Sequence, residues 1–447
     1  MLNPGIFKAY DIRGTYPDQI NEETVKQIVW GYIDLIKPQK VIIGLDARKS
    51  SPNLKTAVVD AFLLAGVDVL DLGFCSTPVF YFALTNRAAD GGIMITASHN
   101  PAQYNGLKLC RAKAAAIDGE TGGYEIRDRI LTGQTKEKKS ERPGQIKTTH
   151  ITDEYIEKTL AKIDTGALGN IKVVADAGNG MAGKEIEKIF AEIPAGLTKL
   201  YFKIDGSFPN HEANPLKEET LQKLEETIIE KKASLGVAFD GDGDRISFLD
   251  ERGKLIRGDF ITALLARRLL RENPSQKVYF EVRSSKIVPE TIAAAGGQPI
   301  LGRPGHSVIK NAMRQQDILF GGELSGHYFF REFGFVENPV YALLLVLQIL
   351  SQSDQKMSAL IAPFARYQQS GEINFSVEDP PGVLGRVKQY YGDAQTKEID
   401  GLTVIYPGWW FNLRQSNTEP LVRLNLEADT PTLLQEKLTE VKKIING

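Results

Sequence analysis

Three aspartates separated by single glycines are the strongest chemical signal in the sequence: Asp240, Asp242 and Asp244. Alternate residues of an extended segment share one face, so these carboxylates are expected to converge. Converging carboxylates repel each other unless a cation lies among them. A hard divalent cation such as Mg²⁺ suits an all-oxygen site and accepts phosphate oxygens as further ligands. Arg245 follows directly and would either screen the acids or face a phosphate bound to the same metal.

Two other interpretations of this segment are weaker. A solvated acidic turn would need no ligand. A calcium loop fits the spacing of the aspartates and of Glu251, but it needs a glycine where this chain has Arg245, and helices where we expect strands. We therefore predict a magnesium site rather than a calcium site.

A second candidate follows the expected strand Gly92–Ala97, where the sequence is Thr96-Ala-Ser-His-Asn-Pro101. A strand end presents Ser98 to a cleft, and Asn100-Pro101 forces the chain to turn. Lys108 lies on what we expect to be the next strand. Taken alone, this segment would be explained best as an ordinary polar turn.

Further loops carry ligand-binding side chains. Gly322-Glu-Leu-Ser-Gly-His327 combines a carboxylate, a hydroxyl and an imidazole, which suits a polyol, and Gly302–His306 is a weaker version. Arg414-Gln-Ser-Asn-Thr-Glu-Pro420 offers a bidentate guanidinium, side-chain donors and backbone N–H groups, which suit phosphate. The plain alternatives are a glycine-rich connection and a solvated hairpin turn.

A glycine-rich turn at Gly178–Gly183 matches the dinucleotide-binding fingerprint, and Asp205 lies where a ribose-binding acid would be. A fingerprint of this kind is a weak signal on its own. The simpler interpretation is a tight strand-to-helix turn that needs glycine for its backbone angles.

Alternating strands and helices must position these segments. Apolar runs such as Lys40–Asp46, Ile171–Ala177 and Lys277–Val282 are typical of buried strands, and helical patterns separate them. That alternation predicts parallel sheets covered on both faces. From residue 368 onward, several short strand patterns precede a final helix, which indicates a smaller antiparallel domain.

The fold class that we predict is α/β, with three α/β mixed-sheet domains and a smaller C-terminal α+β domain around a central cleft. A polar, lysine-rich connection between Leu131 and Lys147 places the first boundary near residue 150. The predicted domains, residues 1–150, 151–250, 251–367 and 368–447, carry in turn the serine loop, the aspartate cluster, the Gly322–His327 loop and the Arg414–Pro420 loop.

Composition excludes several other classes of protein. The 447 residues carry 54 Lys and Arg against 56 Asp and Glu, whereas nucleic-acid and membrane-surface proteins need a basic excess. Cys75 and Cys110 are too few for a disulfide framework and fit a reducing compartment. The N-terminus lacks a signal-peptide pattern, and the longest apolar run, Tyr341–Leu350, is too short for a membrane span. We expect a cytoplasmic protein with no nucleic-acid or membrane partner.

Together, these motifs resemble those of the α-D-phosphohexomutase family, most closely its phosphomannomutase/phosphoglucomutase branch. The matching segments occur in order along essentially the whole chain: Lys8–Gly14, Thr96–Pro101, Asp240–Arg245, Gly322–His327 and Arg414–Pro420. The resemblance implies the four-domain architecture and an enzyme that interconverts hexose 6-phosphate and hexose 1-phosphate, for mannose, glucose or both. It implies an active-site phosphoserine, Mg²⁺, and hexose 1,6-bisphosphate as intermediate and activator. It also explains Gly178–Gly183 as a turn that binds no dinucleotide.

The resemblance implies roles for individual residues. Ser98 would carry the phosphoryl group, and Mg²⁺ would be held by Ser98 together with Asp240, Asp242 and Asp244. The candidates for moving the proton of the attacking hydroxyl are Arg13, Lys108 and His327, with His99 assisting near the phosphoserine. The implied substrate-binding residues are Arg245, Arg283, His306, Glu323, Ser325, Arg414, Ser416, Asn417 and Thr418. The partners would be small sugar phosphates, and a monomer and a homodimer both stay open.

Some positions depart from the family pattern: Leu324 stands where methionine is common, Arg283 where a lysine contacts substrate, and Gln415 where proline is common. At Arg283 the charge is kept but the geometry is not, because arginine and lysine bind phosphate differently. None of the three positions is Ser98 or an aspartate of the cluster, so the changes bear on sugar preference and not on phosphoryl transfer.

A phosphoglucosamine mutase is the alternative function, although the Lys8–Gly14 and Gly322–His327 segments favour the first interpretation. An NAD-linked oxidoreductase is a remote alternative, because it leaves Ser98 and the aspartates unexplained. A catalytically inactive binding protein is disfavoured, since no residue assigned to phosphoryl transfer is missing.

Overall fold

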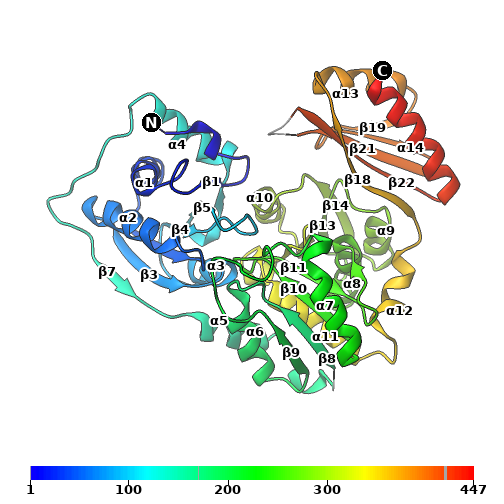
Figure 1. Ribbon diagram of the computed structural model, residues 1–447, viewed down its shortest axis with the longest axis horizontal. Coiled ribbons are helices and arrows are strands. Elements are labelled where there is room, and N and C mark those ends of the chain that lie inside the picture. The colour runs from blue at the N-terminus through cyan, green and yellow to red at the C-terminus, as the bar shows by residue number, and fades with distance from the viewer. Residues whose placement is uncertain (1, 170, 417–419) are drawn as a thin grey trace. The chain divides into compact units, whose positions relative to one another are not determined.

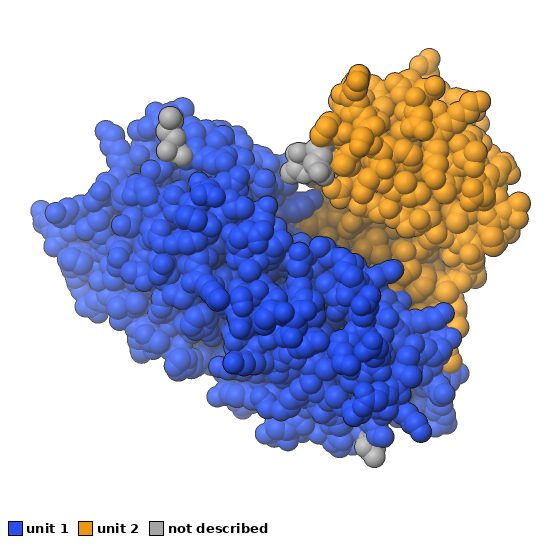
Figure 2. Space-filling view, viewed as in Figure 1, with its two compact units in different colours: residues 1–256, 306–320, 325–358 blue, residues 257–305, 321–324, 359–447 orange. Residues whose placement is uncertain are grey.

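The structure, a computed structural model, describes residues 2–169, 171–416 and 420–447. The chain forms two compact units, which Figure 2 shows in different colours. The first unit comprises residues 1–256, 306–320 and 325–358, and the second comprises residues 257–305, 321–324 and 359–447. Strand β15 (Phe320–Gly322) and helix α12 (Met357–Ile361) lie where the chain passes from one unit to the other.

The N-terminal part of the first unit is built on a mixed sheet with the strand order β1-β5-β4-β2-β3-β7, and β6 pairs with β5. Its strands are β1 (Ile12–Thr15), β2 (Lys40–Leu45), β3 (Asp68–Phe74), β4 (Gly91–Ile95), β5 (Tyr104–Arg111), β6 (Ala116–Ile117) and β7 (Ile146–Thr148). Its helices are α1 (Glu22–Ile36), α2 (Ser51–Leu64), α3 (Thr77–Asn86) and α4 (Tyr124–Leu131) (Figure 1). Apolar side chains of β2, α1 and α2, such as Ile43, Ile28 and Phe62, form one core.

A second mixed sheet of the first unit has the order β12-β11-β10-β8-β9. Its strands are β8 (Lys172–Asp176), β9 (Gly196–Leu200), β10 (Leu235–Phe239), β11 (Ile246–Leu249) and β12 (Leu255–Ile256), and its helices are α5 (Thr152–Leu160), α6 (Ala182–Ala191) and α7 (Glu218–Lys231). β10 pairs with β8 in parallel and with β11 antiparallel. The first unit also contains α10 (His306–Gln316), β16 (Tyr328–Phe330), β17 (Val336–Glu337) and the apolar helix α11 (Pro339–Ser351).

The second unit contains the parallel strands β13 (Lys277–Glu281) and β14 (Gln298–Gly302), with helices α8 (Gly258–Glu272) and α9 (Ile287–Ala294). Its C-terminal part is an antiparallel sheet of order β18-β22-β21-β20-β19. These strands are β18 (Gln368–Ser376), β19 (Gln395–Lys397), β20 (Leu402–Tyr406), β21 (Trp409–Gln415) and β22 (Leu421–Ala428). Helices α13 (Pro380–Tyr390) and α14 (Pro431–Asn446) pack on each other and on this sheet (Figure 1).

The predicted fold class is confirmed in its secondary structure: mixed α/β sheets come first, and an antiparallel α+β sheet comes last. The final helix is capped as the sequence suggests, because the Thr430 side chain accepts a hydrogen bond from Leu433 N and Pro431 begins the helix. Strands, and not helices, flank the aspartate cluster, which agrees with the rejection of a calcium loop. In the described part of the chain, we find no helix with the length and apolar character of a membrane span.

The glycine-rich turn after β8 has a structural role in the first unit. Gly178 has a left-handed φ of 53°. A side chain at Gly180 would lie 2.6 Å from the backbone oxygen of Gly241, inside the aspartate cluster. The glycine therefore lets the turn approach the aspartate loop closely, which accounts for its type without a dinucleotide.

Candidate active site

Ser98 lies just beyond the end of β4, in a backbone conformation that needs support. Its φ is 50°, in the left-handed region, which costs a non-glycine residue about 1–3 kcal/mol. Ser98 N donates to Thr96 Oγ1 at 2.8 Å, and Thr96 Oγ1 in turn donates to Asp46 Oδ2 at 2.7 Å. The side chain is buried and donates from Oγ to Asp240 Oδ2 at 2.7 Å. The fold thus places the serine oxygen directly on the aspartate cluster.

A buried arginine, Arg48, fixes the backbone of the Ser98 loop through hydrogen bonds. Its guanidinium donates to four backbone oxygens at 2.6–2.9 Å, those of Ser98, Asn100, Pro101 and Tyr104. Asp46 balances its charge through the Nε–Oδ2 contact of 3.1 Å. Sequence reasoning did not identify Arg48, because a single Arg after a strand carries no signal that distinguishes a buried clamp from a surface charge.

The three aspartates lie in the loop between β10 and β11 and are fully buried. Asp240 Oδ1 accepts from the backbone N–H groups of Asp244 at 3.1 Å and Arg245 at 3.2 Å, which folds the loop around the first carboxylate. Asp242 Oδ2 accepts from Thr77 Oγ1 at 2.6 Å. The convergence expected from the i, i+2, i+4 spacing is confirmed, since one oxygen of each aspartate lies within 4.8 Å of the others.

Lys108, on β5, is the main internal counter-charge of this cluster. Its Nζ lies 2.7 Å from Asp242 Oδ2 and 2.5 Å from Asp244 Oδ2. Burial alone would lower the pKa of Lys108, but the two carboxylates raise it above its ordinary value. The ammonium is therefore held in its charged form.

The carboxylates respond to the cluster in opposite ways. Burial, together with the charges of Asp244 and Asp242, raises the pKa of Asp240 to about 8. Burial also acts on Asp244, but Lys108 and His327 hold the pKa of that carboxyl well below its usual value. Negative charge is therefore crowded at Asp240, whereas the neighbouring cationic groups stabilise the ionised form of Asp244.

The donor set fits a divalent metal ion. All ligand atoms are carboxylate oxygens, and Asp242 Oδ1 is buried without a hydrogen-bond partner among the described residues. Burying a carboxylate oxygen without a partner destabilises the folded protein unless a cation binds to that oxygen. An all-oxygen cluster is the donor set that Mg²⁺ prefers. The acidic triad is thus a metal-binding site by its chemistry.

Histidines surround the cluster. The Nδ1 atom of His99 lies 3.2 Å from Ser98 Oγ, and burial and Arg245 keep the pKa of His99 well below its usual value. The Nε2 atom of His327 lies 3.3 Å from Asp244 Oδ1, and its Nδ1 lies 2.9 Å from Ser325 Oγ. Within the first unit, His327 therefore links Ser325 to the aspartate cluster.

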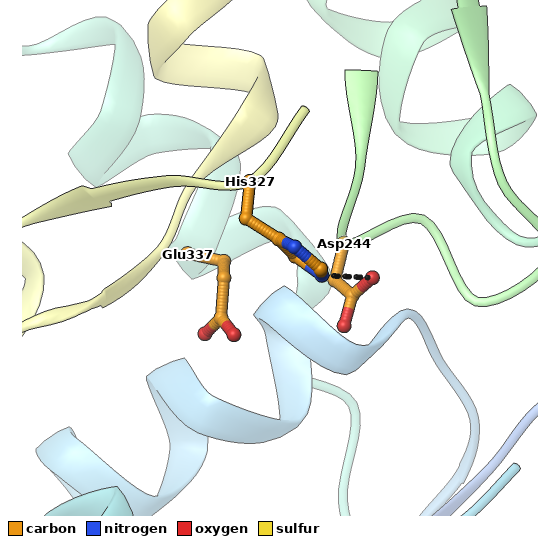
Figure 3. A group of neighbouring side chains, drawn as sticks. All are labelled: Asp244, His327 and Glu337. Atoms are coloured by element: carbon orange, nitrogen blue, oxygen red, sulfur yellow. Dashed lines mark ion pairs between the residues drawn. The ribbon is translucent and has the colours of Figure 1, made fainter. Parts of the chain in front are cut away.

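A second group of possible metal ligands, Asp244, His327 and Glu337, is drawn in Figure 3. Only His327 and Asp244 are joined there by an ion pair. Both oxygens of Glu337 lie 3.1 Å from Lys310 Nζ, a fully buried ammonium, so its charge is already balanced. The aspartate triad is the better metal site, and Lys310 and Glu337 are a structural pair that sequence reasoning missed.

His306 lies beside this pair. Its Nδ1 is 3.7 Å from Glu337 Oε1, and both ring nitrogens are buried without a hydrogen bond to any described residue. Burial and the Lys310 charge keep the pKa of His306 well below its usual value, so the ring is neutral.

Arg13, on β1, lies near the cluster as well. It donates to Asp11 from Nε at 2.8 Å and from Nη2 at 2.6 Å, and to Asn100 Oδ1 at 2.6 Å. Arg245 donates from Nε to His327 Nε2 at 3.4 Å. The first unit therefore brings together these predicted site residues: Arg13, Ser98, His99, Lys108, Asp240, Asp242, Asp244, Arg245, His306, Ser325 and His327.

The second unit holds the remaining predicted residues that are described: Arg283, Glu323, Arg414 and Ser416. Arg283 Nη2 lies 2.7 Å from Glu281 Oε1 and 3.6 Å from Glu323 Oε1. Glu323 also accepts from Gly305 N at 3.1 Å. Arg414 forms an ion pair with Glu372. Asn417 and Thr418 lie outside the described residues.

Comparison with known proteins identifies the family to which the chain is similar. The family profiles for domains I, II and III of "Phosphoglucomutase/phosphomannomutase, alpha/beta/alpha" match residues 4–137, 153–253 and 257–367, and the profile for the C-terminal domain matches residues 372–444.

Relatives match over nearly their whole length. A phosphomannomutase of Salmonella montevideo is 37% identical over 457 residues, with 100% of both chains covered. A protein of Xanthomonas campestris pv. campestris named phosphohexose mutases is 36% identical over 446 residues, with 99% of both covered. A solved phosphoglucomutase/phosphomannomutase family protein from Burkholderia thailandensis has a TM-score of 0.91 at 31% identity, covering 100% of this chain and 98% of its own. The chain belongs to the phosphoglucomutase/phosphomannomutase family.

Proposed function

We propose that the protein is a phosphohexomutase that interconverts hexose 6-phosphate and hexose 1-phosphate, with mannose, glucose or both as the sugar. The observation that carries this proposal is the contact of 2.7 Å between Ser98 Oγ and Asp240 Oδ2, inside a buried acidic triad. A serine oxygen held on a candidate metal site is arranged to carry a phosphoryl group. The family relatives named as mutases support the same reaction.

In the resting enzyme Ser98 would carry the phosphate, and Asp240, Asp242 and Asp244 would hold Mg²⁺ together with a phosphoserine oxygen. When bound, the metal supplies a Lewis acid that offsets the charge of the phosphoryl oxygens. Arg245 lies 3.8 Å from Asp240 and would add a second positive charge at the same place. Arg48, which donates to the backbone oxygen of Ser98 at 2.8 Å, would keep Ser98 in its left-handed conformation during the transfer.

The transfer breaks the bond between phosphorus and Ser98 Oγ and forms one between phosphorus and a sugar hydroxyl oxygen. The product is a hexose 1,6-bisphosphate, which then turns so that its other phosphate returns to Ser98. The proton of the attacking hydroxyl has to leave. Of the candidates, His327 is best suited, because a neutral imidazole has a ring nitrogen that can accept a proton. Burial acts to lower the pKa of Arg13 and of Lys108, but the nearby carboxylates raise both above their ordinary values, so these two groups stay charged.

The residues of the second unit would bind the part of the sugar phosphate that is not reacting. Glu323 and, from the first unit, Ser325 would accept and donate to ring hydroxyls. Arg283, His306, Arg414 and Ser416 would hold substrate, with the arginines on phosphate oxygens. The buried free thiols Cys75 and Cys110 fit a reducing, cytoplasmic setting.

A coupled assay with Mg²⁺ and a trace of hexose 1,6-bisphosphate tests the proposal on mannose 1-phosphate, glucose 1-phosphate and glucosamine 1-phosphate. Turnover of the first two supports the proposed function. Turnover of glucosamine 1-phosphate alone keeps the phosphoryl mechanism but identifies a phosphoglucosamine mutase. No turnover of any sugar by protein that carries phosphate on Ser98 would contradict the proposal.

A further inference from the structure

An ion network on the C-terminal antiparallel sheet contains Glu372 and Arg423, two residues to which the proposed reaction gives no role. Glu372, on β18, forms ion pairs with Arg414 on β21 and, at 3.2 Å, with Arg423 on β22. Arg283 Nη1 lies 4.0 Å from the same carboxylate. One glutamate thus sits among three guanidinium groups, all within the second unit.

The strand register places these side chains on one face of the sheet. Arg414 is paired with Arg423, and Glu372 is paired with Asn425. Because alternate residues of a strand share a face, Arg423 and Asn425 project to the same side as Glu372 and Arg414. The arrangement is a row of donors, with one carboxylate as their acceptor.

That carboxylate does not satisfy the donors around it. Three buried atoms have no hydrogen-bond partner among the described residues: Arg414 Nη1, Arg423 Nε and Asn425 Nδ2. Buried donors are normally paired. Three unpaired donors on one patch therefore indicate a ligand that offers more acceptor oxygens than a carboxylate does. A phosphate group offers three terminal oxygens and up to two negative charges.

The charges lead to the same conclusion. Three carboxylates face three guanidinium groups, but the ion pairs are unevenly shared. Glu281 and Glu323 both pair with Arg283, whereas Arg414 and Arg423 share the single carboxylate of Glu372. If the Glu372 carboxylate moved away, the group would carry one unpaired positive charge. Burial and the nearby Arg283 guanidinium lower the pKa of Arg414, which shows how crowded the cations already are.

We infer that Glu372 is a displaceable internal ligand: it occupies the Arg414–Arg423 guanidinium pair in the ligand-free protein, and the phosphate monoester of the substrate takes its place. Arg423 and Asn425 then become phosphate-binding residues beside Arg414. The inference rests on the proposed function, since that function supplies a sugar phosphate as ligand. Glu372 is about a third exposed, so its side chain has room to swing into solvent.

Displacement would also sharpen the choice of ligand. A dianionic phosphate that replaces the single negative charge of Glu372 gains additional attraction to the guanidinium groups. A neutral sugar or a carboxylate gains no such attraction. The second ionisation of a phosphate monoester lies near pH 6, so this advantage fades below that pH.

The test measures binding apart from turnover. Glucose 6-phosphate is titrated calorimetrically into the full chain at pH 7.5, in a Ser98→Ala background that cannot transfer phosphate, with glucose as the phosphate-free probe. Glu372→Gln should lower the Kd for glucose 6-phosphate about fivefold, because two competing ion pairs are weakened. Arg423→Met should raise the Kd about tenfold, the effect of one charge-assisted hydrogen bond. Arg423→Lys should fall between Arg423→Met and the parent.

The matched control is Glu378→Gln, which removes one exposed negative charge from the same unit without touching the guanidinium groups. Its Kd should stay within about twofold of the parent if long-range charge effects are screened. Weaker or unchanged binding in Glu372→Gln would show that Glu372 only holds the arginines in place and would overturn the inference, as would an unchanged Kd in Arg423→Met.

The two proposals fail separately. If protein with Ser98 intact shows no mutase activity but Glu372→Gln tightens binding, the proposed function is wrong and the displaceable ligand stands. If the protein is an active mutase and Glu372→Gln loosens binding, only the displaceable ligand is wrong.

Discussion

Arg48 offers the sharpest test of how the fold positions the reacting serine. The change is Arg48→Lys, which keeps the charge that Asp46 needs. The Arg48 side chain makes five hydrogen bonds, four to backbone oxygens and one to Asp46. A lysine ammonium has only three N–H donors, so at least two bonds are lost. Charge-assisted hydrogen bonds contribute about 1.5–3 kcal/mol each, and relaxation of the loop toward water places the expected loss of stability near 3 kcal/mol.

The catalytic effect should exceed the effect on binding. Without its clamp, Ser98 relaxes from the left-handed conformation and its Oγ moves on the aspartate cluster. A displacement of about 1 Å at a reacting atom costs on the order of 100-fold in rate. We therefore expect kcat to fall between about tenfold and 100-fold, with KM for the sugar phosphate changed by less than about threefold.

Urea unfolding followed by tryptophan fluorescence measures the loss of stability. The coupled mutase assay measures kcat and KM. Arg142→Lys, an exposed change of the same chemistry, is the control and should alter neither. An Arg48→Lys variant with unchanged stability and unchanged kcat would refute the reasoning that Arg48 holds the serine loop.

The remaining predictions concern the metal, the phosphate and pH. Asp242→Asn should raise the Mg²⁺ concentration for half-maximal activity by at least about tenfold, and an unchanged Mg²⁺ dependence would count against the triad as the metal site. Arg414→Ala should raise KM about tenfold with a small change in kcat, since it removes a contact common to ground and transition states; a selective loss of kcat would contradict that role. Burial raises the pKa of Glu185, on α6, to about 8. Between the ordinary pKa of a glutamic acid and about 8, Glu185 is protonated in the folded state but ionised in the unfolded state. The free energy of unfolding should therefore fall as the pH rises toward 8. Glu185→Gln should flatten that slope between pH 5 and 8 in urea unfolding, and an unaltered slope would show that Glu185 is not the group responsible.

Local sequence patterns predicted much of the fold and the acidic part of the site. The alternation of apolar runs and turns identified strands such as β10, and the Arg245–Ile256 hairpin appears as β11 and β12. The convergence of the aspartates followed from strand periodicity, because their contacts are local. Ser98 was placed correctly at a strand end for the same reason.

Contacts between distant residues could not be predicted in this way. Arg48 and Ser98 are separated by 50 residues and meet only because β2 and β4 are neighbours in the sheet. Lys108 and Asp242 are separated by 134 residues: Lys108 lies on β5 of one sheet, and Asp242 lies in the loop between β10 and β11 of another. Glu372 carries no motif at all, and its role depends on the pairing of β18 with β22. Where a charge is buried is a property of the packed fold, which a single sequence does not display.

The most direct test of the central claim is mass spectrometry of the Ser98 peptide during turnover. The enzyme is incubated with Mg²⁺ and hexose 1,6-bisphosphate whose phosphates are isotope-labelled. It is then given unlabelled hexose 1-phosphate. The phosphoserine mechanism predicts phosphate on Ser98 that passes to the sugar in a single turnover, and a Ser98→Ala protein that binds substrate but transfers nothing. Mutase turnover in protein whose Ser98 never carries phosphate, or near-normal turnover in Ser98→Ala, would contradict it.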